Sequence, residues 1–472
     1  MAYTIAKIDS PTEKQQGIIN ELHEFINDKK KLVHVIHGYA GTGKTYLLKH
    51  FLKQYKGNCC ITAPSHKAVR VLETMLGKKG KTVHSLCGLR MNVDLDTFDI
   101  ANPQFDPSGN DYIKNYNLLI IDEWSQINTG LASLLDIKSR QYNVKLLYVG
   151  DPCQLPPVHE ELSVISKYPN KSVLTELIRQ KDTNPLVKLL TLIRNDILEG
   201  TDTFIPYLIK HRKDISNHEG YILLNDIDFK KTILDYYKHP NFFKNVDFIR
   251  TIAWTNQCVG NWNKYIRNSI FDNPSEILCE HDLLTAYTTV VDEFSAPVIV
   301  NSEDYLISNL RKYKDSNGIA NYAVNFINVQ GGEFDNISKL ETSTIKIANP
   351  HDKEGFTKFY NTLCALHYRA IKANAANRKL YWRNYYIFKN EHLSMLGFKL
   401  GNNNGNAFVK KDIDYGYAFT CHKAQGSTYN NIAIDLEDIA FNKSINAPNK
   451  LLRDKLIYVA LSRAKQMAII KL

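Results

Sequence analysis

Long apolar runs, paired cysteines and internal repeats are all missing from this sequence. No run of about 18 apolar residues occurs, so we expect no transmembrane helix. The first residues, MAYTIAKIDSPTEKQQ, lack the charged-then-apolar layout of a signal peptide, which favours an intracellular protein. None of the eight cysteines forms a C-x-x-C pair, and we therefore expect neither a zinc site nor a disulfide framework.

A strong charge of either sign is also missing. The 472 residues carry 59 Lys and Arg against 49 Asp and Glu, a net charge of +10. This mild excess is compatible with a polyanionic partner but does not identify one. The content of 44% hydrophobic and 23% charged residues is typical of a soluble globular protein, and the length predicts about two to four domains. Apart from Asp122 and Glu123, which are discussed below, the sequence shows no carboxylate cluster at metal-binding spacing, so a nuclease activity has no support.

Short apolar runs alternate with amphipathic helical patterns along much of the chain. LVHVIHG, NCCITAP, NLLIIDE and VKLLYVGD are bounded by Gly, Pro or Asp, which is typical of a parallel sheet covered on both faces. We predict one α/β domain over 1–90 and 117–172, interrupted by a polar, turn-rich insertion over 91–116. A second α/β domain is predicted over 173–285 and 412–472. A module over 286–411, with β-like runs and one basic aromatic segment, interrupts it.

A phosphate-binding loop follows the strand LVHVIHG. Its sequence matches G-x-x-x-x-G-K-[ST] and opens a predicted helix, with the residues Gly38, Tyr39, Ala40, Gly41, Thr42, Gly43, Lys44 and Thr45. Glycines permit positive φ, so that successive N–H groups can curl around phosphate oxygens at a helix N-terminus. We predict an ATP site in which Lys44 reaches the β and γ phosphates and the Thr45 hydroxyl binds Mg²⁺.

Carboxylates and a glutamine follow two later strands. The run LLIIDEWS ends in Asp122 and Glu123, and surface charge is the alternative interpretation of such a pair. After a phosphate loop, Asp122 is predicted to hold Mg²⁺ and Glu123 to orient or deprotonate the attacking water. Gln154, in GDPCQLPPV, can sense a γ phosphate without adding charge. Arg179 and Arg463 are predicted to stabilise transition-state charge from a domain that has no phosphate loop of its own.

Together these motifs resemble a known family of motor proteins. The chain is similar to superfamily 1 DNA helicases of the 5′→3′ class, the Dda and RecD type, in an ordered series over nearly its whole length. The series is PTEKQQ, GYAGTGKT, APSHKAVR, TVHSLCGL, IIDEWS, GDPCQLPPV, LTELIRQ, AWTNQCVGNWN, YAFTCHKAQGST and YVALSRAK. Departures are Tyr39 in place of the usual proline, Trp124 after the Asp-Glu pair, and Ser462 before the arginine.

The resemblance implies two RecA-like domains with ATP and Mg²⁺ in the cleft between them. It assigns adenine recognition to Gln15 and places Gly426 at the nucleotide. It implies a small β insertion that carries the strand-splitting wedge, here 91–116, and an SH3-like accessory module, here 286–411. The partners that it implies are single-stranded DNA and tailed duplex DNA. A single-strand-binding, replication or recombination protein is a further candidate partner. The resemblance also implies a cytoplasmic protein of phage or bacterial type.

A translocase must hold the DNA backbone without reading bases, which calls for hydroxyls, amides and N–H groups on phosphates. Such side chains gather at predicted strand ends, the usual ligand edge of a parallel sheet. A structural or solvated role is the alternative for any single histidine. The predicted DNA contacts are Pro64, Ser65, His66, Lys67, Thr82, His84, Ser85, Thr255, Asn256, Thr420, His422, Lys423, Gln425 and Ser427.

Two aromatic groups remain ambiguous. The segment LHYRAIKANAANRKLYWRNYYIFKN (366–390) interleaves rings with Arg and Lys, which suits single-stranded nucleic acid. We favour the alternative that an amphipathic helix packs Tyr381, Trp382 and Tyr385 into its own module. Phe98, Phe105 and Tyr112 in the insertion are candidates for stacking at a DNA fork.

The sequence therefore predicts an ATP- and Mg²⁺-dependent helicase that moves 5′→3′ on single-stranded DNA and unwinds duplex. The first alternative is a translocase that strips proteins from the strand, or an RNA-directed motor. The second is an ATPase or DNA-binding subunit of a larger complex. Unwinding of a bare tailed duplex by the isolated chain discriminates among them.

Overall fold

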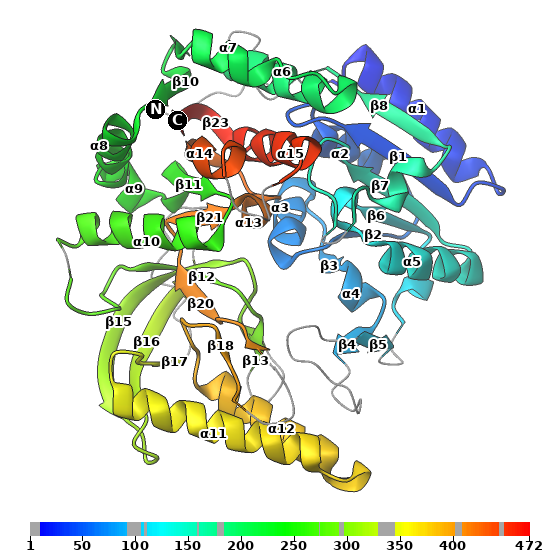
Figure 1. The fold of residues 1–472 in the computed structure, drawn as a ribbon. Coiled ribbons are helices and arrows are strands. Elements are labelled where there is room, and N and C mark those ends of the chain that lie inside the picture. Colours follow the sequence, from blue (N-terminus) through cyan, green and yellow to red (C-terminus); the bar gives the residue numbers. More distant parts are fainter. Residues whose placement is uncertain are drawn as a thin grey trace.

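Two six-stranded sheets, each the centre of an α/β domain, form the upper part of the molecule, and a third module hangs below the second sheet (Figure 1). This arrangement comes from a computed structural model. It describes residues 10–91, 105–107, 111–157, 160–176, 184–272, 274–291, 297–328, 345–401, 408–442 and 448–472.

The first sheet is parallel throughout and has the order β3-β2-β6-β7-β1-β8. Its strands are β1 (Val33–Gly38), β2 (Cys59–Ala63), β3 (Gly80–Thr82), β6 (Leu118–Ile121), β7 (Lys145–Gly150) and β8 (Lys171–Leu174). The strands are apolar on both sides because helices cover both faces. The covering helices are α1 (Glu13–Asn27), α2 (Lys44–Gln54), α3 (His66–Leu76), α4 (Val83–Leu86) and α5 (Thr129–Tyr142).

The second sheet has the order β21-β11-β22-β23-β10-β9, parallel except for the β9–β10 hairpin at its edge. Its strands are β9 (Lys213–Ser216), β10 (Glu219–Leu224), β11 (Ile249–Ala253), β21 (Ala418–Thr420), β22 (Tyr429–Asp435) and β23 (Ala464–Lys471). Its helices are α6 (Leu186–Glu199), α7 (Phe204–Lys210), α8 (Asp226–Tyr237), α9 (Pro240–Lys244), α10 (Asn256–Ile270), α13 (Cys421–Ala424), α14 (Leu436–Ala440) and α15 (Lys450–Leu461). Two parallel-sheet α/β domains, as predicted, are therefore present.

The accessory module is built on an antiparallel sheet of order β17-β16-β15-β12-β20. Its strands are β12 (Leu283–Ala286), β15 (Asp304–Lys314), β16 (Ala320–Asn328), β17 (Ile345–Ala348) and β20 (Ile413–Tyr415). Two strand pairs and two long helices complete it: β13 (Val290–Val291) with β14 (Pro297–Ile299), β18 (Phe398–Lys399) with β19 (Phe408–Val409), α11 (Lys353–Lys372) and α12 (Ala375–Glu391). An SH3-like architecture for this module stays a prediction.

The sheet boundaries differ by a few residues from the predicted domain limits. β12 and β20 pair with each other and belong to the accessory sheet, although the predicted module begins at 286 and ends at 411. The predicted division at 172 and 173 falls inside β8, which pairs with β1 of the first sheet. Short strands at the edge of a module carry too few residues to show in the sequence which sheet they join.

A two-stranded antiparallel pair, β4 (Leu89–Met91) and β5 (Phe105–Pro107), stands at the predicted insertion, with β4 beginning two residues before the predicted limit at 91. Phe98 lies outside the described residues, and for Phe105 only the backbone is described. Short 3₁₀ turns occur at Ile113–Asn115, Trp124–Gln126, Val164–Lys167 and Val246–Phe248. Among the helices described, none combines the length and the apolar character that crossing a membrane requires.

Candidate nucleotide and nucleic-acid sites

The phosphate loop links β1 to α2 in the predicted strand–loop–helix context. Gly41 and Gly43 have φ of 82° and 76°, a left-handed conformation that side chains with a Cβ rarely adopt. At Gly38 a Cβ would lie 2.6 Å from Cγ of Lys44, so close passage of the lysine also requires glycine. Thr42 is buried and its hydroxyl donates to the carbonyl of Tyr39 at 2.8 Å. The loop is therefore fixed by its own residues.

Lys44, the first residue of α2, lies back over this loop. Its Nζ donates to the carbonyl oxygens of Gly38 at 2.8 Å and Tyr39 at 3.2 Å. This position keeps the ammonium at the mouth of the helix N-terminus, where a phosphate is attracted by both the ammonium and the N–H groups.

Two carboxylates, Asp122 and Glu123, follow β6 near the loop. Burial raises the pKa of Asp122 to about 7, the neighbouring Glu123 adds to this, and Lys44 opposes it. Oδ1 of Asp122 and Oε2 of Glu123 are buried with no hydrogen-bond partner among the described residues. Buried carboxylate oxygens without partners are costly, and a hard cation such as Mg²⁺ prefers such ligands. The pair therefore fits a cation brought by a nucleotide.

Glu123 has an unusual backbone. Its φ is 54°, a left-handed conformation in which a residue with a Cβ is uncommon. The next residue, Trp124, is buried. Its ring lies tilted against that of His37, with the centroids 5.2 Å apart, and its indole donates to the carbonyl of Ile36 at 3.4 Å. Gly150 accommodates it, because a Cβ there would lie 2.7 Å from the indole. The unusual tryptophan is thus packed into the first domain below the carboxylates.

Gln15 sits at the first turn of α1 in a capping box. Thr12 Oγ1 accepts from the N–H of Gln15 at 3.3 Å, and the side-chain oxygen of Gln15 accepts from the N–H of Thr12 at 3.2 Å. The Gln15 side chain is fully buried, yet its Nε2 has no partner among the described residues. An amide held by its oxygen with an unused donor is suited to an acceptor nitrogen of an adenine ring.

Glutamines from the two α/β domains are in contact with each other. Nε2 of Gln425, after α13, donates to Oε1 of Gln154 at 2.9 Å and lies 3.4 Å from the hydroxyl of Ser125. Gln154 was predicted at the γ phosphate and Gln425 at DNA. The structure joins them in one hydrogen-bonded contact between the domains.

A second contact between the two domains involves Tyr458 and Asp151, neither of which the sequence analysis predicted as a site residue. Tyr458, on α15 of the second domain, donates to Asp151 Oδ2 at 2.6 Å and accepts from the N–H of Ala40 at 3.0 Å. Both side chains are buried. The available signals were an aspartate directly after β7, in GDPCQ, and a tyrosine five residues before Arg463, but nothing in the sequence connects them.

Of the two arginines predicted to stabilise transition-state charge, the structure describes Arg463 but not Arg179. Arg463 is buried against its own domain, where it donates to the carbonyls of Val459 at 3.0 Å and Ser427 at 3.1 Å and to the hydroxyl of Ser462 at 2.7 Å. Ser462, one of the departures from the family pattern, therefore orients the guanidinium. Arg179 lies outside the described residues. Gly426 has φ of 79°, which favours glycine there.

Four of the hydroxyls predicted to contact DNA are N-caps of helices that follow strands. Ser65, Thr82, Thr255 and Thr420 accept from the N–H groups of Ala68, Ser85, Cys258 and Lys423, at 3.2 or 3.3 Å. Caps of this kind stabilise the first turn by about 1 kcal/mol. The hydroxyl of Thr255 also donates to Asp438 at 2.9 Å, so this threonine is engaged on both sides.

The histidines of the same edges are placed differently from the caps. His66 and His422 are exposed, and partial burial lowers the pKa of each imidazole, which makes them neutral near pH 7. His84, Pro64 and Gln425 are half-buried, Asn256 and Ser85 are exposed, and Ser427 is buried with an unpartnered hydroxyl. The predicted DNA residues thus occupy two sheet edges, one in each α/β domain.

The lysines of these edges face the accessory module. Nζ of Lys67 lies 3.6 Å from Asp304, and Arg70 on the same helix pairs with Glu303 at 2.7 Å. Lys423 donates to the carbonyl of Ala286 at 2.7 Å, and burial lowers its pKa to about 7, against the opposing charge of Asp304. The first domain, the second domain and the accessory module therefore meet at one cluster of charges.

Comparisons with known proteins agree with this architecture. A family model described as an AAA domain matches residues 12–204, and one described as a UvrD-like helicase C-terminal domain matches residues 415–470. The uncharacterized protein R530 of Acanthamoeba polyphaga mimivirus is 26% identical over 96% of this chain and 98% of its own length.

Two named helicases are also similar. The ATP-dependent DNA helicase dda of Enterobacteria phage T4 is 25% identical over 57% of this chain and 60% of that protein, so this match spans less than two thirds of the relative. The crystal structure of the Pif1 helicase from Bacteroides, solved with ADP-AlF3 and ssDNA, has a TM-score of 0.50 at 18% identity. It covers 97% of this chain and 92% of that one, and it shows a shared fold.

Proposed function

We propose that this chain, which belongs to the superfamily 1 helicases of the Pif1, Dda and RecD type, couples ATP hydrolysis to 5′→3′ movement on single-stranded DNA and unwinds duplex DNA ahead of it. The observation that carries the proposal is the phosphate loop of the first domain in hydrogen-bonded contact with Tyr458 of the second. A nucleotide bound at such a loop can bias how the two domains sit relative to each other.

The nucleotide site would work through charge and position. The N–H groups of the loop and the ammonium of Lys44 would bind the phosphates, and Gln15 would hold the adenine. Thr45 and Asp122 would hold Mg²⁺, which neutralises phosphate charge when bound. Glu123 would take a proton from the attacking water, and its buried, unpartnered oxygen is consistent with a base held ready. Arg463, and in our prediction Arg179, would stabilise charge on the transferred phosphoryl group.

Stepping would follow from the contact between the glutamines. Gln154 of the first domain is the residue predicted to sense the γ phosphate, and its partner Gln425 lies two positions after Lys423, a predicted DNA residue. Closing this contact with ATP and opening it after hydrolysis would move one sheet edge relative to the other. Alternating grip on the strand at the two edges would convert that cycle into net movement.

The test is unwinding of a short duplex that carries either a 5′ or a 3′ single-stranded tail, with ATP and Mg²⁺. We expect unwinding only from the 5′ tail. Lys44→Ala is expected to lower the rate of unwinding about a hundredfold or more, because it removes the positive charge that is predicted to contact the phosphates. The matched control is Lys49→Ala, which removes an exposed lysine of the same helix.

The other outcomes lead to different conclusions. Unwinding from the 3′ tail would retain the motor and overturn its direction. ATP hydrolysis stimulated by single strands, without unwinding from either tail, would favour a protein-displacing translocase or a subunit that needs a partner.

A further inference from the structure

Two adjacent carboxylates of the accessory module face the first α/β domain. Glu303 and Asp304, which stand where β15 begins, are only 5% and 6% exposed. A guanidinium nitrogen of Arg70 lies 2.7 Å from Glu303, and the ammonium of Lys67 lies 3.6 Å from Asp304. Carboxylates are rarely this buried unless a cation pairs with them. The accessory module and helix α3 are therefore joined by two neighbouring ion pairs.

Asp304 is also held by the second domain and by its own module. The buried guanidinium of Arg250, on β11, lies 3.3 Å from it, and the hydroxyl of Thr285, on β12, donates to it at 2.5 Å. Burial raises the pKa of Asp304, but Lys67 and Arg250 outweigh this effect and hold the pKa below its ordinary value. The carboxylate is therefore ionised, and Lys67 is its partner from the first domain.

The two cations belong to a helix whose start is predicted to contact DNA. Lys67 and Arg70 are three positions apart on α3 and so lie on the same face of the helix. Their side chains are 26% and 41% exposed, and Ser65 and His66, two other predicted DNA residues, stand at the start of the same helix. A phosphate binds such cations through anionic oxygens, as the two carboxylates do. DNA and the accessory module thus offer the same kind of partner to the same side chains.

The lysine that is predicted to contact DNA from the second domain is engaged by the same module. Lys423 donates to the carbonyl of Ala286 at 2.7 Å, and its ammonium lies 3.8 Å from the ring centroid of Tyr287. The end of β12 and the beginning of β15 together contact a predicted DNA lysine of each α/β domain. The accessory module is therefore placed to influence how both domains hold a strand.

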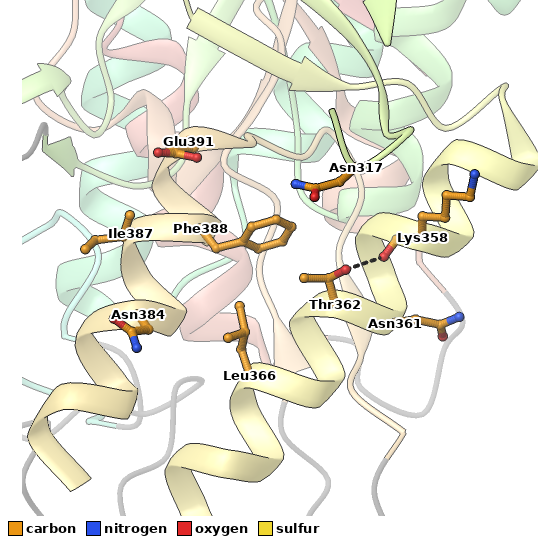
Figure 2. A pocket seen from close by; sticks show the side chains of 9 residues that line it. All are labelled: Asn317, Lys358, Asn361, Thr362, Leu366, Asn384, Ile387, Phe388 and Glu391. Atoms are coloured by element: carbon orange, nitrogen blue, oxygen red, sulfur yellow. Dashed lines mark hydrogen bonds between the residues drawn. The ribbon is translucent and has the colours of Figure 1, made fainter. Parts of the chain in front are cut away.

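The α11–α12 hairpin of this module lies apart from the contact with α3 (Figure 1). Trp382 and Tyr385, 2% and 0% exposed, pack between its helices, which confirms the favoured interpretation for these two rings, and Tyr381 is half-buried. A groove of about 770 Å³ lies between the helices, and Figure 2 shows Thr362 and Phe388 pointing toward each other across it. The residues that line this groove all belong to the accessory module, so the groove is separate from the ion pairs at α3.

We propose that Glu303 and Asp304 form an autoinhibitory pair, which occupies the cations of α3 in the place of DNA phosphates and so weakens the binding of single-stranded DNA. Arg250 keeps Asp304 with the second domain, so a movement of the first domain relative to the second opens the pairs and frees Lys67 and Arg70 for DNA. The grip of the first domain then depends on the position of the accessory module. The inference rests on the proposed function, because it takes single-stranded DNA as the ligand of α3.

The test uses Glu303→Gln, Arg70→Gln and the variant that combines them. Glutamine keeps the size of Glu303 and an oxygen that can accept from the hydroxyl of Tyr305, 3.3 Å away. Replacing Asp304 instead would leave Arg250 buried without its anion. The affinity of each full-length chain for a single-stranded oligothymidylate is measured by fluorescence anisotropy, without nucleotide and over a range of salt concentrations.

The matched control is Glu276→Gln. Glu276 pairs with Lys312, near the other end of β15, at 2.5 Å and accepts from the hydroxyl of Tyr322 at 2.8 Å. This variant also removes one paired carboxylate beside a tyrosine, but away from α3. It therefore reports the effect of the change in net charge alone.

For Glu303→Gln we expect single-strand affinity to rise about threefold to tenfold, because Arg70 becomes available to a phosphate. The slope of log K against log salt should steepen by about 0.7, the contribution of one cation bound to a single strand. The double variant should bind no more tightly than Arg70→Gln, because the gain passes through that arginine. Glu276→Gln should stay within about twofold of the wild type.

An unchanged or lower affinity of Glu303→Gln would overturn the proposal, and so would an equal gain in Glu276→Gln or an added gain in the double variant. Unwinding of a tailed duplex is measured on the same samples. If Glu303→Gln binds more tightly as expected but no chain unwinds, the proposed motor fails and the competition for α3 stands.

Discussion

The hydroxyl of Tyr458 connects Asp151 to the N–H of Ala40, at 2.6 and 3.0 Å. Asp151 follows β7, and Ala40 lies in the phosphate loop, so both belong to the first domain. Tyr458 is on the last helix of the second domain and is 1% exposed. One hydroxyl therefore ties the position of the second domain to the loop that is predicted to hold the phosphates.

Replacing Tyr458 with phenylalanine tests this link, because it removes only the oxygen. We expect the rate of single-strand-stimulated ATP hydrolysis to fall about tenfold, since a hydrogen bond to a charged group contributes about 1.5–3 kcal/mol. Affinity for single-stranded DNA should be retained. Tyr142→Phe on α5, a half-buried tyrosine of the first domain away from this contact, is the control. Equal rates for the two variants would remove the proposed role of Tyr458.

Gln154 and Gln425 lend themselves to a double-mutant cycle, because each is the other's partner at 2.9 Å. Each single change to alanine should slow stimulated ATP hydrolysis, and the double variant should be little worse than either one. The coupling expected for residues in contact is about 0.5–3 kcal/mol. Strictly additive losses in kcat would show that the two amides act independently.

We expect the ionised Asp122 side chain to lower the stability of the folded protein, although ATP hydrolysis requires this residue. Its pKa is raised to about 7 by burial and by Glu123, so the folded protein binds its proton more tightly than the unfolded chain does. The stability that the protonated form provides is present below the unfolded pKa of about 4 and is lost as pH rises through about 7.

Asp122→Asn removes this ionisation. We expect a melting temperature at pH 8, without metal or nucleotide, that is higher by a few degrees, with a smaller gain at pH 5 and with ATP hydrolysis abolished. Differential scanning fluorimetry at the two pH values measures the effect. A melting temperature that falls at both would contradict the expected strain at this carboxylate.

From the lowered pKa of Lys423 we predict how the affinity of the protein for single-stranded DNA depends on pH. Burial lowers its pKa to about 7, so the ammonium is charged below this pH and is lost above it. If the ammonium contacts a phosphate, affinity measured without nucleotide should weaken as pH rises from about 6 to 8. Lys423→Met should flatten that dependence. A steep dependence that survives in the variant would point to the histidines, His66 and His422, instead.

Local motifs were predictable because their residues act within one turn of chain. The glycines at 41 and 43 need positive φ, and their spacing to Lys44 and Thr45 is fixed by the start of a helix. Asp122 and Glu123 followed from the end of an apolar strand. The predicted roles of all these residues stay proposals, but their neighbourhood is as expected.

Contacts between the two α/β domains were not predictable. Tyr458 and Asp151 are 307 positions apart, and their meeting depends on how two sheets are placed, which no periodicity encodes. The threonines at strand ends had a second role that their type alone could not reveal, because an N-cap and a phosphate contact favour the same hydroxyl in the same place. The long basic segment was expected as one helix and is two, with a break at Ala373 and Asn374.

The pairing of β12 with β20 has a consequence for how such a chain can change over generations. Leu284 faces Tyr415 and Ala286 faces Ile413, so the polypeptide leaves the second domain and returns to it through neighbouring strands. Adjacent exit and return points are the geometry at which one segment can be exchanged for another of different length without rebuilding the host sheet. The accessory module can thus be exchanged as a unit, and engineered chimeras should be joined at β12 and β20.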